Sequence, residues 1–343
     1  MKAAHTDRHK KEAKRLGMVL ALVVSDGRFM KRLVFAIALT LLPVSVWAQA
    51  SGAPPDTAPT TAPGHELTLD LSGYNYVEPG DLRISIHGVK FGGEYSGTFL
   101  LNARQHWFTR TNVRAKTGRT DYDGWCAPWL ITPDRSSPNG YALNVGDFST
   151  YDDSGNRDWY VEGRALAGND LVGHRWTWSP ETGLGIRHLS NALDGIAGYR
   201  TDNYLYLPVG LTARTAVASH NVLTLNVEYD HLIHGWQTTR DSAFGGSAID
   251  ATTTAPAFTL DGLTDVSFDQ HQGWALRAGA KFEMTRRVSV EPYWIHWQVG
   301  DSPDSFETAT YTVNGITARQ DLGVYEPHNT TDEFGVKFSF RVR

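Results

Sequence analysis

The chain has 343 residues, of which 41% are hydrophobic, and it carries a formal net charge of −5. This charge, with no basic stripe, argues against a nucleic-acid-binding protein. Because Cys126 is the only cysteine, an internal disulfide and a thiolate metal cluster are excluded. The body of the chain lacks an apolar run of about 20 residues, which excludes membrane-spanning helices there. We expect no cofactor and no metal.

Residues 30–50 have the pattern of a secretory signal peptide. The basic pair Lys31-Arg32 precedes an apolar run from Leu33 to Val46, and small residues spaced for cleavage occur at 46–48 and at 48–50. Export with no anchor following it predicts a location in the periplasm, in the outer membrane or outside the cell.

Two further segments flank this signal. We expect translation to begin at Met30, so that residues 1–29 are a mis-annotated upstream extension; a long natural n-region is the alternative. Residues 51–65 are rich in Pro, Thr and Ala, which predicts a disordered linker.

From residue 66 to residue 343, apolar and polar residues alternate with a period of two, which predicts an all-β domain. The expected strands lie near residues 67–76, 82–95, 107–116, 159–168, 176–189, 200–211, 223–230, 274–284, 288–294 and 331–343. Ten strands predict a single antiparallel barrel with meander topology, although eight or twelve remain possible.

Interruptions of the alternation predict a bulge and three loops. In the second strand the apolar residues change parity after Ile86, which predicts a bulge at His87-Gly88. Residues 124–157, 239–271 and 303–330 lack a period and are predicted to be long loops. Short turns on one side, long loops on the other and an even strand count predict that both termini are periplasmic.

The strand faces opposite the apolar ones carry full charges, which is the inverted polarity of a transmembrane barrel. The charged residues expected to face the lumen are Glu162, Arg164, Arg200, Asp202, Glu228, Asp230, Arg277, Lys281, Glu283, Glu291, Lys337 and Arg341. Side chains largely fill the lumen of a barrel of about ten strands, and buried charges need partners. We therefore expect these charges to pair with one another and to plug the lumen.

Aromatic residues on the apolar faces are expected to form the girdles at the two membrane interfaces. These residues are Trp159, Trp274, Trp294, Phe338 and Phe340.

The terminal strand, Thr331-Thr-Asp-Glu-Phe-Gly-Val-Lys-Phe-Ser-Phe340, together with the signal peptide, resembles an outer-membrane β-barrel of a Gram-negative bacterium. The segments Tyr74–Pro79, Tyr204–Gly210, Glu228–Gly235 and Glu326–Thr331 resemble uncharacterised proteobacterial barrels of this size. The resemblance implies contact with outer-membrane lipid and lipopolysaccharide, and with the barrel-insertion machinery. Such barrels usually end on an aromatic residue, whereas this chain ends Phe340-Arg-Val-Arg343.

The layout also resembles, more loosely, the omptins, which are ten-stranded outer-membrane endopeptidases. Their site pairs two aspartates at i, i+2 with an Asp-x-His pair across the barrel mouth. Asp121 and Asp123 match the first pair in spacing, and neighbouring carboxylates can raise one pKa to make a base. For the second pair the candidate is Asp241, but residue 243 is Ala instead of His.

The sequence thus favours a non-enzymatic surface or envelope barrel with long extracellular loops and a largely plugged lumen. Loop aromatics such as Trp125 and Trp129 are candidates for binding an extracellular ligand that the sequence does not identify. An omptin-like endopeptidase that uses Asp121 and Asp123 is the first alternative, and a narrow porin is the second.

Overall fold

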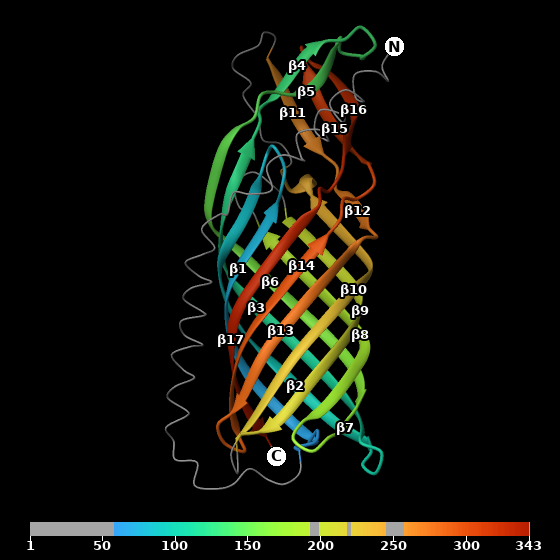
Figure 1. Cartoon of the computed structure of the whole chain (residues 1–343). Helices are drawn as coiled ribbons and strands as arrows, with labels where there is room; N and C mark the ends of the chain where they lie inside the picture. The colour runs from blue at the N-terminus through green and yellow to red at the C-terminus, as the bar shows by residue number, and fades with distance from the viewer. Residues whose placement is uncertain (1–57, 193–198, 218–220, 245–256, 343) are drawn as a thin grey trace.

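The computed structural model describes residues 58–192, 199–217, 221–244 and 257–342 (Figure 1). The expected signal peptide at 30–50 and the expected extension at 1–29 lie outside these residues. Of the expected linker at 51–65, residues 58–65 are described, and the first strand begins at Gly64. The described residues include no helix that is long and apolar enough to cross a membrane.

The described chain forms a closed antiparallel barrel of ten strands, which confirms the predicted fold class and meander order. The barrel strands, in chain order, are β1 (Gly64–Glu78), β2 (Ile84–Asn102), β3 (Trp107–Cys126), β6 (Ser149–Asn169), β8 (Thr177–Ala192), β9 (Tyr199–Ala216), β10 (Val222–Arg240), β13 (Gly273–Glu283), β14 (Val288–Val299) and β17 (Asn329–Val342). Each pairs with the next, and β17 closes the barrel against β1, where His65 lies opposite Val342.

The two ends of the barrel differ. At the end that we call the turn end lie the start of β1, the end of β17 and short connections such as residues 103–106 (Figure 1). A short strand, β7 (Leu171–Val172), pairs with β8 there. At the opposite end, which we call the loop end, the three long connections emerge, and β12 (Val266–Gln270) extends the pairing of β10 beyond β13.

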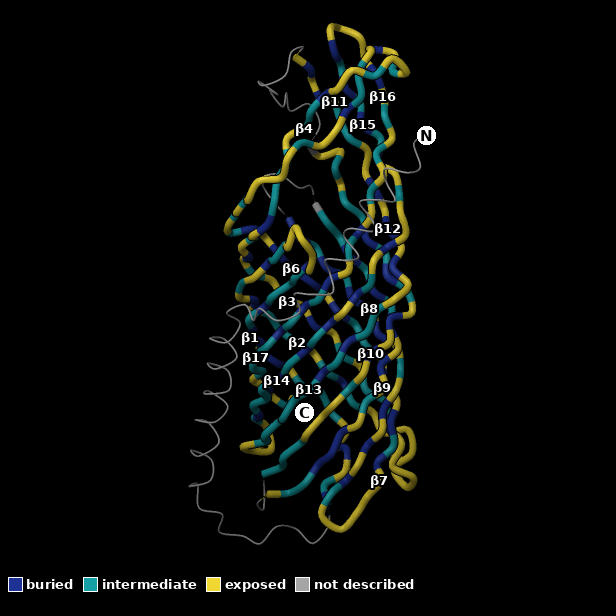
Figure 2. The backbone as a smooth tube through the Cα atoms, turned by 45° about the horizontal axis from the view of Figure 1, so that its top comes forward, coloured by how far each residue is buried: buried dark blue, intermediate teal, exposed yellow. Residues whose placement is uncertain are grey.

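Along the barrel strands, buried residues alternate with more exposed ones (Figure 2). The buried residues belong to the lumen face and the exposed ones to the outer face. On β1, Leu67, Leu69 and Leu71 point outward and are 52–64% exposed, whereas the intervening Thr68 and Asp70 are buried. Apolar side chains outside and polar side chains inside are the polarity of an outer-membrane β-barrel, so the chain has that fold.

The three long connections were predicted to be loops without structure, and this is wrong. They contain the hairpin β4 (Trp129–Pro133) and β5 (Tyr141–Val145), a short helix η1 (Asp241–Phe244), and the sheet of β11 (Phe258–Leu263), β15 (Ser305–Val313) and β16 (Ile316–Val324). These elements form a head above the loop end (Figure 1).

The head has its own apolar core. Ile131 and Leu143 of the β4–β5 hairpin pack against Phe258, Tyr311 and other residues of the three-stranded sheet. The Gln320 side chain of β16 also accepts a hydrogen bond from the backbone N–H of Leu143 and donates one to its carbonyl oxygen, both at 2.8 Å. Side chains from three separate connections are therefore needed to complete this core, which explains why no single segment showed a clear strand pattern.

The predicted bulge at His87-Gly88 is also wrong. The register of β2 with β1 and with β3 is continuous through these residues. Ile86 is buried because it points into the lumen, where apolar side chains also pack, whereas Val89 and Phe91 point outward. The apolar residues therefore change parity because some face the lumen and others face outward, and the strand itself is regular.

Candidate functional site

The lumen is the part of the barrel in which polar side chains gather. Along β1, the inward-facing residues Glu66, Asp70, Tyr74 and Glu78 mark successive levels from the turn end to the loop end. The side chains at these levels differ in how tightly they are packed.

Near the middle of the lumen, the Glu333 carboxylate of β17 is the centre of a buried network. It accepts hydrogen bonds from Arg114 (2.6 Å), Lys116 (2.9 Å), Tyr293 (2.7 Å) and Tyr160 (3.0 Å). Glu333 is only 1% exposed. Because so many donors surround it, this carboxylate is satisfied although it has lost its water.

Asp70 of β1 completes this central network. Its carboxylate accepts from Arg114 at 2.9 Å, from Lys116 at 2.8 Å and from the Tyr293 hydroxyl at 2.8 Å. Two cations therefore face two carboxylates, and the local charges cancel. Buried charges that are paired in this way avoid most of the cost of lone burial.

A second network lies across the lumen, around Arg277 of β13. Its guanidinium bonds Glu162 at 2.5 Å and 3.0 Å and Asp230 at 2.6 Å. Glu228 lies 3.4 Å from Arg277 and is also paired with Arg164. The Tyr206 hydroxyl donates to Glu162 at 2.8 Å.

Toward the loop end, aromatic rings surround the charges. Lys90 and Asp158 form a salt bridge of 2.6 Å in which both side chains are fully buried. The Lys90 ammonium lies 3.2 Å from the centre of the Tyr74 ring. The Arg187 guanidinium lies 4.4 Å from the centre of the Tyr160 ring, and this arrangement is a cation–π contact.

At the loop end itself, Arg200 of β9 bridges two carboxylates. It lies 3.0 Å from Glu78 and 2.7 Å from Glu326. Glu326 belongs to the connection between β16 and β17, so this contact ties the head to the barrel. Burial raises the pKa of Glu326 to about 8, although Arg200 opposes the shift.

The turn-end half of the lumen is more open. Its ion pairs include Glu66–Lys281 (2.7 Å) and Glu94–Lys337 (2.8 Å), whose side chains are 13–19% exposed. These pairs line a cavity of about 360 Å³, which we call the vestibule. Its walls are mostly polar, so water can fill it.

The predicted lumen residues therefore lie at several levels. Glu162, Arg164, Glu228, Asp230 and Arg277 form the second network described above. The remaining members lie at the loop end or around the vestibule, and these are Arg200, Asp202, Lys281, Glu283, Glu291, Lys337 and Arg341.

Several buried charges were not among the predicted lumen residues. These include Asp70, Lys90, Arg114, Lys116, Asp158 and Arg187. Each lies on a regular strand with the parity of the lumen face, so strict counting by two along each strand would have found them.

The predicted girdle residues all belong to the outward faces of their strands. Trp159, Phe338 and Phe340 are 40–47% exposed. Trp294 stacks on Phe334 and donates from Nε1 to Asp332 at 3.0 Å, and Trp274 packs beside His296. Their role at a membrane interface stays a prediction.

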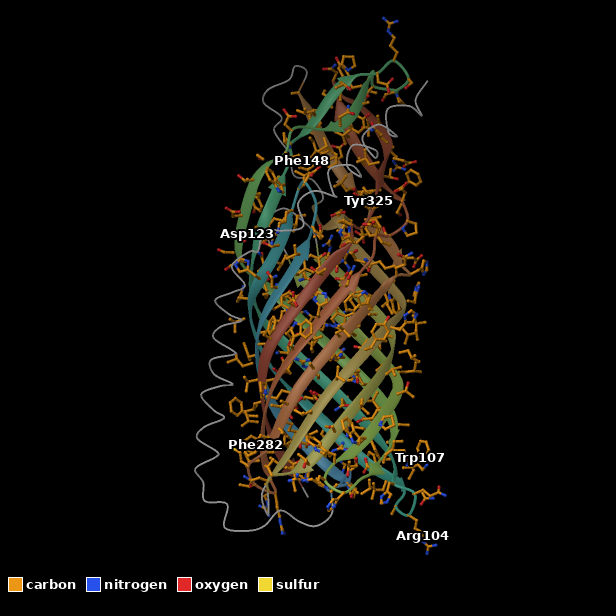
Figure 3. All side chains as sticks on the ribbon, in the orientation of Figure 1. Arg104, Trp107, Asp123, Phe148, Phe282 and Tyr325 are labelled. Carbon is orange, nitrogen blue, oxygen red and sulfur yellow. The ribbon has the colours of Figure 1, made fainter. Side chains whose placement is uncertain are left out.

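The residues predicted for an omptin-like site are not brought together. On β3, Asp121 and Asp123 lie on the same strand face as the exposed residues Trp107 and Val113, so they point away from the barrel mouth. Figure 3 shows Asp123 on the outer side of the barrel. The Asp123 carboxylate lies 3.4 Å from Nδ1 of His87, which also faces outward. The parity of β3 alone would have indicated this orientation.

Asp241, the third candidate, lies in η1, where it faces a carboxyl of the head. Burial and the nearby Asp241 charge raise the pKa of Glu307 on β15 to about 8. Burial also raises the pKa of Asp241, and Asp265 adds to this shift. The Asp241–Glu307 pair therefore holds a proton at neutral pH and joins η1 to β15.

Three solved outer-membrane proteins are similar to this chain at low sequence identity. The outer-membrane protease OmpT of Escherichia coli is 9% identical, with 86% of this chain and 99% of that one covered and a TM-score of 0.44. The translocator domain of the autotransporter NalP of Neisseria meningitidis is 10% identical, with 91% and 98% covered and a TM-score of 0.33. An outer-membrane channel of Pseudomonas putida F1 is 9% identical, with 84% and 99% covered and a TM-score of 0.31. No family model and no curated protein matches the chain.

Proposed function

We propose that the protein is a non-enzymatic barrel of the bacterial outer membrane, with a closed lumen and a rigid head that binds a partner outside the cell. In this proposal the loop end faces the exterior, the turn end and both termini face the periplasm, and lipid and lipopolysaccharide surround the apolar outer face. The barrel-insertion machinery would place it there. The exposed leucines of β1 and the outward aromatic side chains support the membrane location.

The buried central network is the observation that most strongly supports the proposal of a closed lumen. Glu333, Asp70, Arg114 and Lys116 converge on one another and are each at most 3% exposed. A water-filled pore would leave such charges hydrated, whereas here protein groups replace the water. This packing favours a closed barrel over a narrow porin.

The head supports a binding role. Phe148, Phe306 and Tyr325 are 50–70% exposed, and Figure 3 shows Phe148 and Tyr325 near the base of the head. Aromatic side chains on a rigid scaffold are common contact residues at protein interfaces. The core around Leu143 holds the three connections together, so these rings are presented by a folded unit.

The outward orientation of Asp121 and Asp123 supports a non-enzymatic role. A hydrolytic pair must share a water with its base at hydrogen-bond distance. Asp123 is instead next to His87 on the outer face, and Asp241 is next to Glu307 in the head. These contacts leave the omptin-like alternative without a common site.

Peptide cleavage tests this proposal directly. The refolded protein, with lipopolysaccharide, is incubated with a fluorogenic dibasic peptide, beside an Asp121→Ala, Asp123→Ala double variant. We expect no cleavage by either protein. Heat-dependent migration on a denaturing gel shows that each sample contains a folded barrel.

Cleavage that disappears in the double variant would make the protein an enzyme and would contradict the proposal. Cleavage of equal rate in both proteins would also contradict it, and would point to other residues.

A further inference from the structure

We propose that residues 58–63 form a strap that closes the turn end of the vestibule, and that a contact between Thr61 and Asp170 acts as its latch. This inference goes beyond the proposed function, because it concerns access to the lumen from the end opposite the head. It does not depend on what the head binds.

The strap crosses the barrel. It leads directly into Gly64, the first residue of β1, yet its hydrogen bonds go to Asp170, which lies between β6 and β7. Asp170 in turn contacts Ser179 near the start of β8 and Arg214 near the end of β9. In the closed order of ten strands, β8 and β9 are the fifth and sixth strands counted from β1, so they lie on the opposite wall. Residues 58–63 therefore span the turn-end opening from one wall to the other.

The latch is a compact buried cluster. The Thr61 amide donates to Oδ2 of Asp170 at 2.6 Å, and the Thr61 hydroxyl donates to Oδ1 at 2.8 Å. Ser179 also donates to Oδ1 of Asp170, at 2.6 Å, and Arg214 donates to Ser179 at 2.7 Å. Thr61 is 8% exposed and Asp170 is 5% exposed. Two bonds to one ionised carboxylate hold the strap firmly at this point.

The strap itself forms part of the vestibule wall. Pro59, Thr60, Thr61 and Ala62 line the cavity, together with the ion pairs of the barrel. The strap residues carry no charge, so they form no salt bridges with those pairs. Because the latch supplies two hydrogen bonds to the strap, its loss should free the strap while the barrel strands stay paired.

Cysteine accessibility can measure the closure. In a Cys126→Ser background, Asn226→Cys places a thiol on the vestibule wall, and Ala58→Cys places one on the buried side of the strap. Each reporter is labelled in the folded, full-length barrel with a small cationic methanethiosulfonate, which is hydrophilic and must enter from water. The latch variant is Thr61→Val, which keeps the side-chain shape and removes the hydroxyl. The matched control is Thr60→Val, at an exposed neighbour.

We expect both reporters to react slowly in the parent and in the Thr60→Val control, and at least tenfold faster in Thr61→Val. A second latch variant, Asp170→Asn, should show the same acceleration because it weakens both bonds from Thr61. Heat-dependent gel mobility confirms that each variant is a folded barrel.

Three results would overturn the proposal. The first is rapid labelling of Asn226→Cys in the parent. The second is an unchanged rate for both reporters in the two latch variants. The third is acceleration at Ala58→Cys without acceleration at Asn226→Cys, because the strap would then move without controlling entry.

Discussion

The two halves of the lumen contain the same kinds of charged side chain, but they differ in packing. Toward the loop end, Lys90 and Asp158 are fully buried. Toward the turn end, Glu283 and Arg341 are 20% and 35% exposed and lie 3.9 Å apart beside the vestibule. Pairing of charges alone therefore does not fill a barrel of this size.

Aromatic rings account for the difference. Tyr160, Tyr204, Tyr206 and Trp297 are all buried in the middle and loop-end levels, where Trp297 contacts both Tyr204 and Tyr206. The rings supply volume, and their hydroxyls and faces satisfy the cations. We conclude that the lumen closes where rings and charges occur together.

The largest effect is expected from breaking the central network. Glu333→Leu would leave Arg114 and Lys116 buried without this carboxylate, so the free energy of unfolding should fall by about 3–5 kcal/mol. Urea unfolding in lipid or detergent, followed by the heat-dependent band shift, measures this change. A loss below about 1 kcal/mol would show that water reaches the network.

A loss of similar size, caused by a cavity and not by an unpaired charge, is expected among the buried rings of the lumen. Trp297→Ala removes a side chain that is 2% exposed, and it should destabilise the barrel by about 3–5 kcal/mol. The control is Trp107→Ala, at an outward residue that is 47% exposed, and it should cost less. Equal losses in the two variants would contradict the filled loop-end half.

The head contributes a pH dependence of stability through Glu307. Glu307 has a pKa of about 8 in the folded head against an ordinary value of 4.5. Its folded form thus binds a proton more tightly than its unfolded form, so the contribution to stability is full below pH 4.5 and is lost as the pH rises through about 8.

Proteolysis within β16 reports this change. Cleavage after Arg319, which needs local opening of the strand, should become severalfold faster in the parent than in Glu307→Gln as the pH rises from 6 toward about 9. Comparing the two proteins at each pH removes the protease's own pH dependence. A constant ratio across this range would exclude the Asp241–Glu307 pair as the titrating group.

The smallest effect is expected in the vestibule. Glu66 and Lys281 form an ion pair that water still reaches, so Lys281→Met should change stability by less than about 1 kcal/mol. The urea assay used for Glu333→Leu measures it. A loss as large as that of Glu333→Leu would remove the distinction between the two halves.

Much of the barrel could be predicted from sequence, because each strand pairs along its whole length and alternates by two. The ten strands and the inverted polarity follow from that pattern alone. At some positions, such as Ile86 and Trp297, an apolar side chain points into the lumen, so an apolar residue there does not mark the outward face. The bulge at His87-Gly88 was wrongly predicted for this reason.

The head could not be predicted, because its core joins residues that are far apart in the sequence. Leu143 and Gln320, for example, are 177 residues apart and meet through two hydrogen bonds. The orientation of Asp121 and Asp123, in contrast, follows from the parity of β3, which the resemblance to omptins obscured.

Conductance across a planar bilayer tests the closed lumen most directly. The account predicts that the inserted wild-type protein, shown to be folded by its heat-dependent mobility, gives no steady current under conditions in which an open porin conducts. Steady currents proportional to voltage would contradict it and would make the protein a narrow channel.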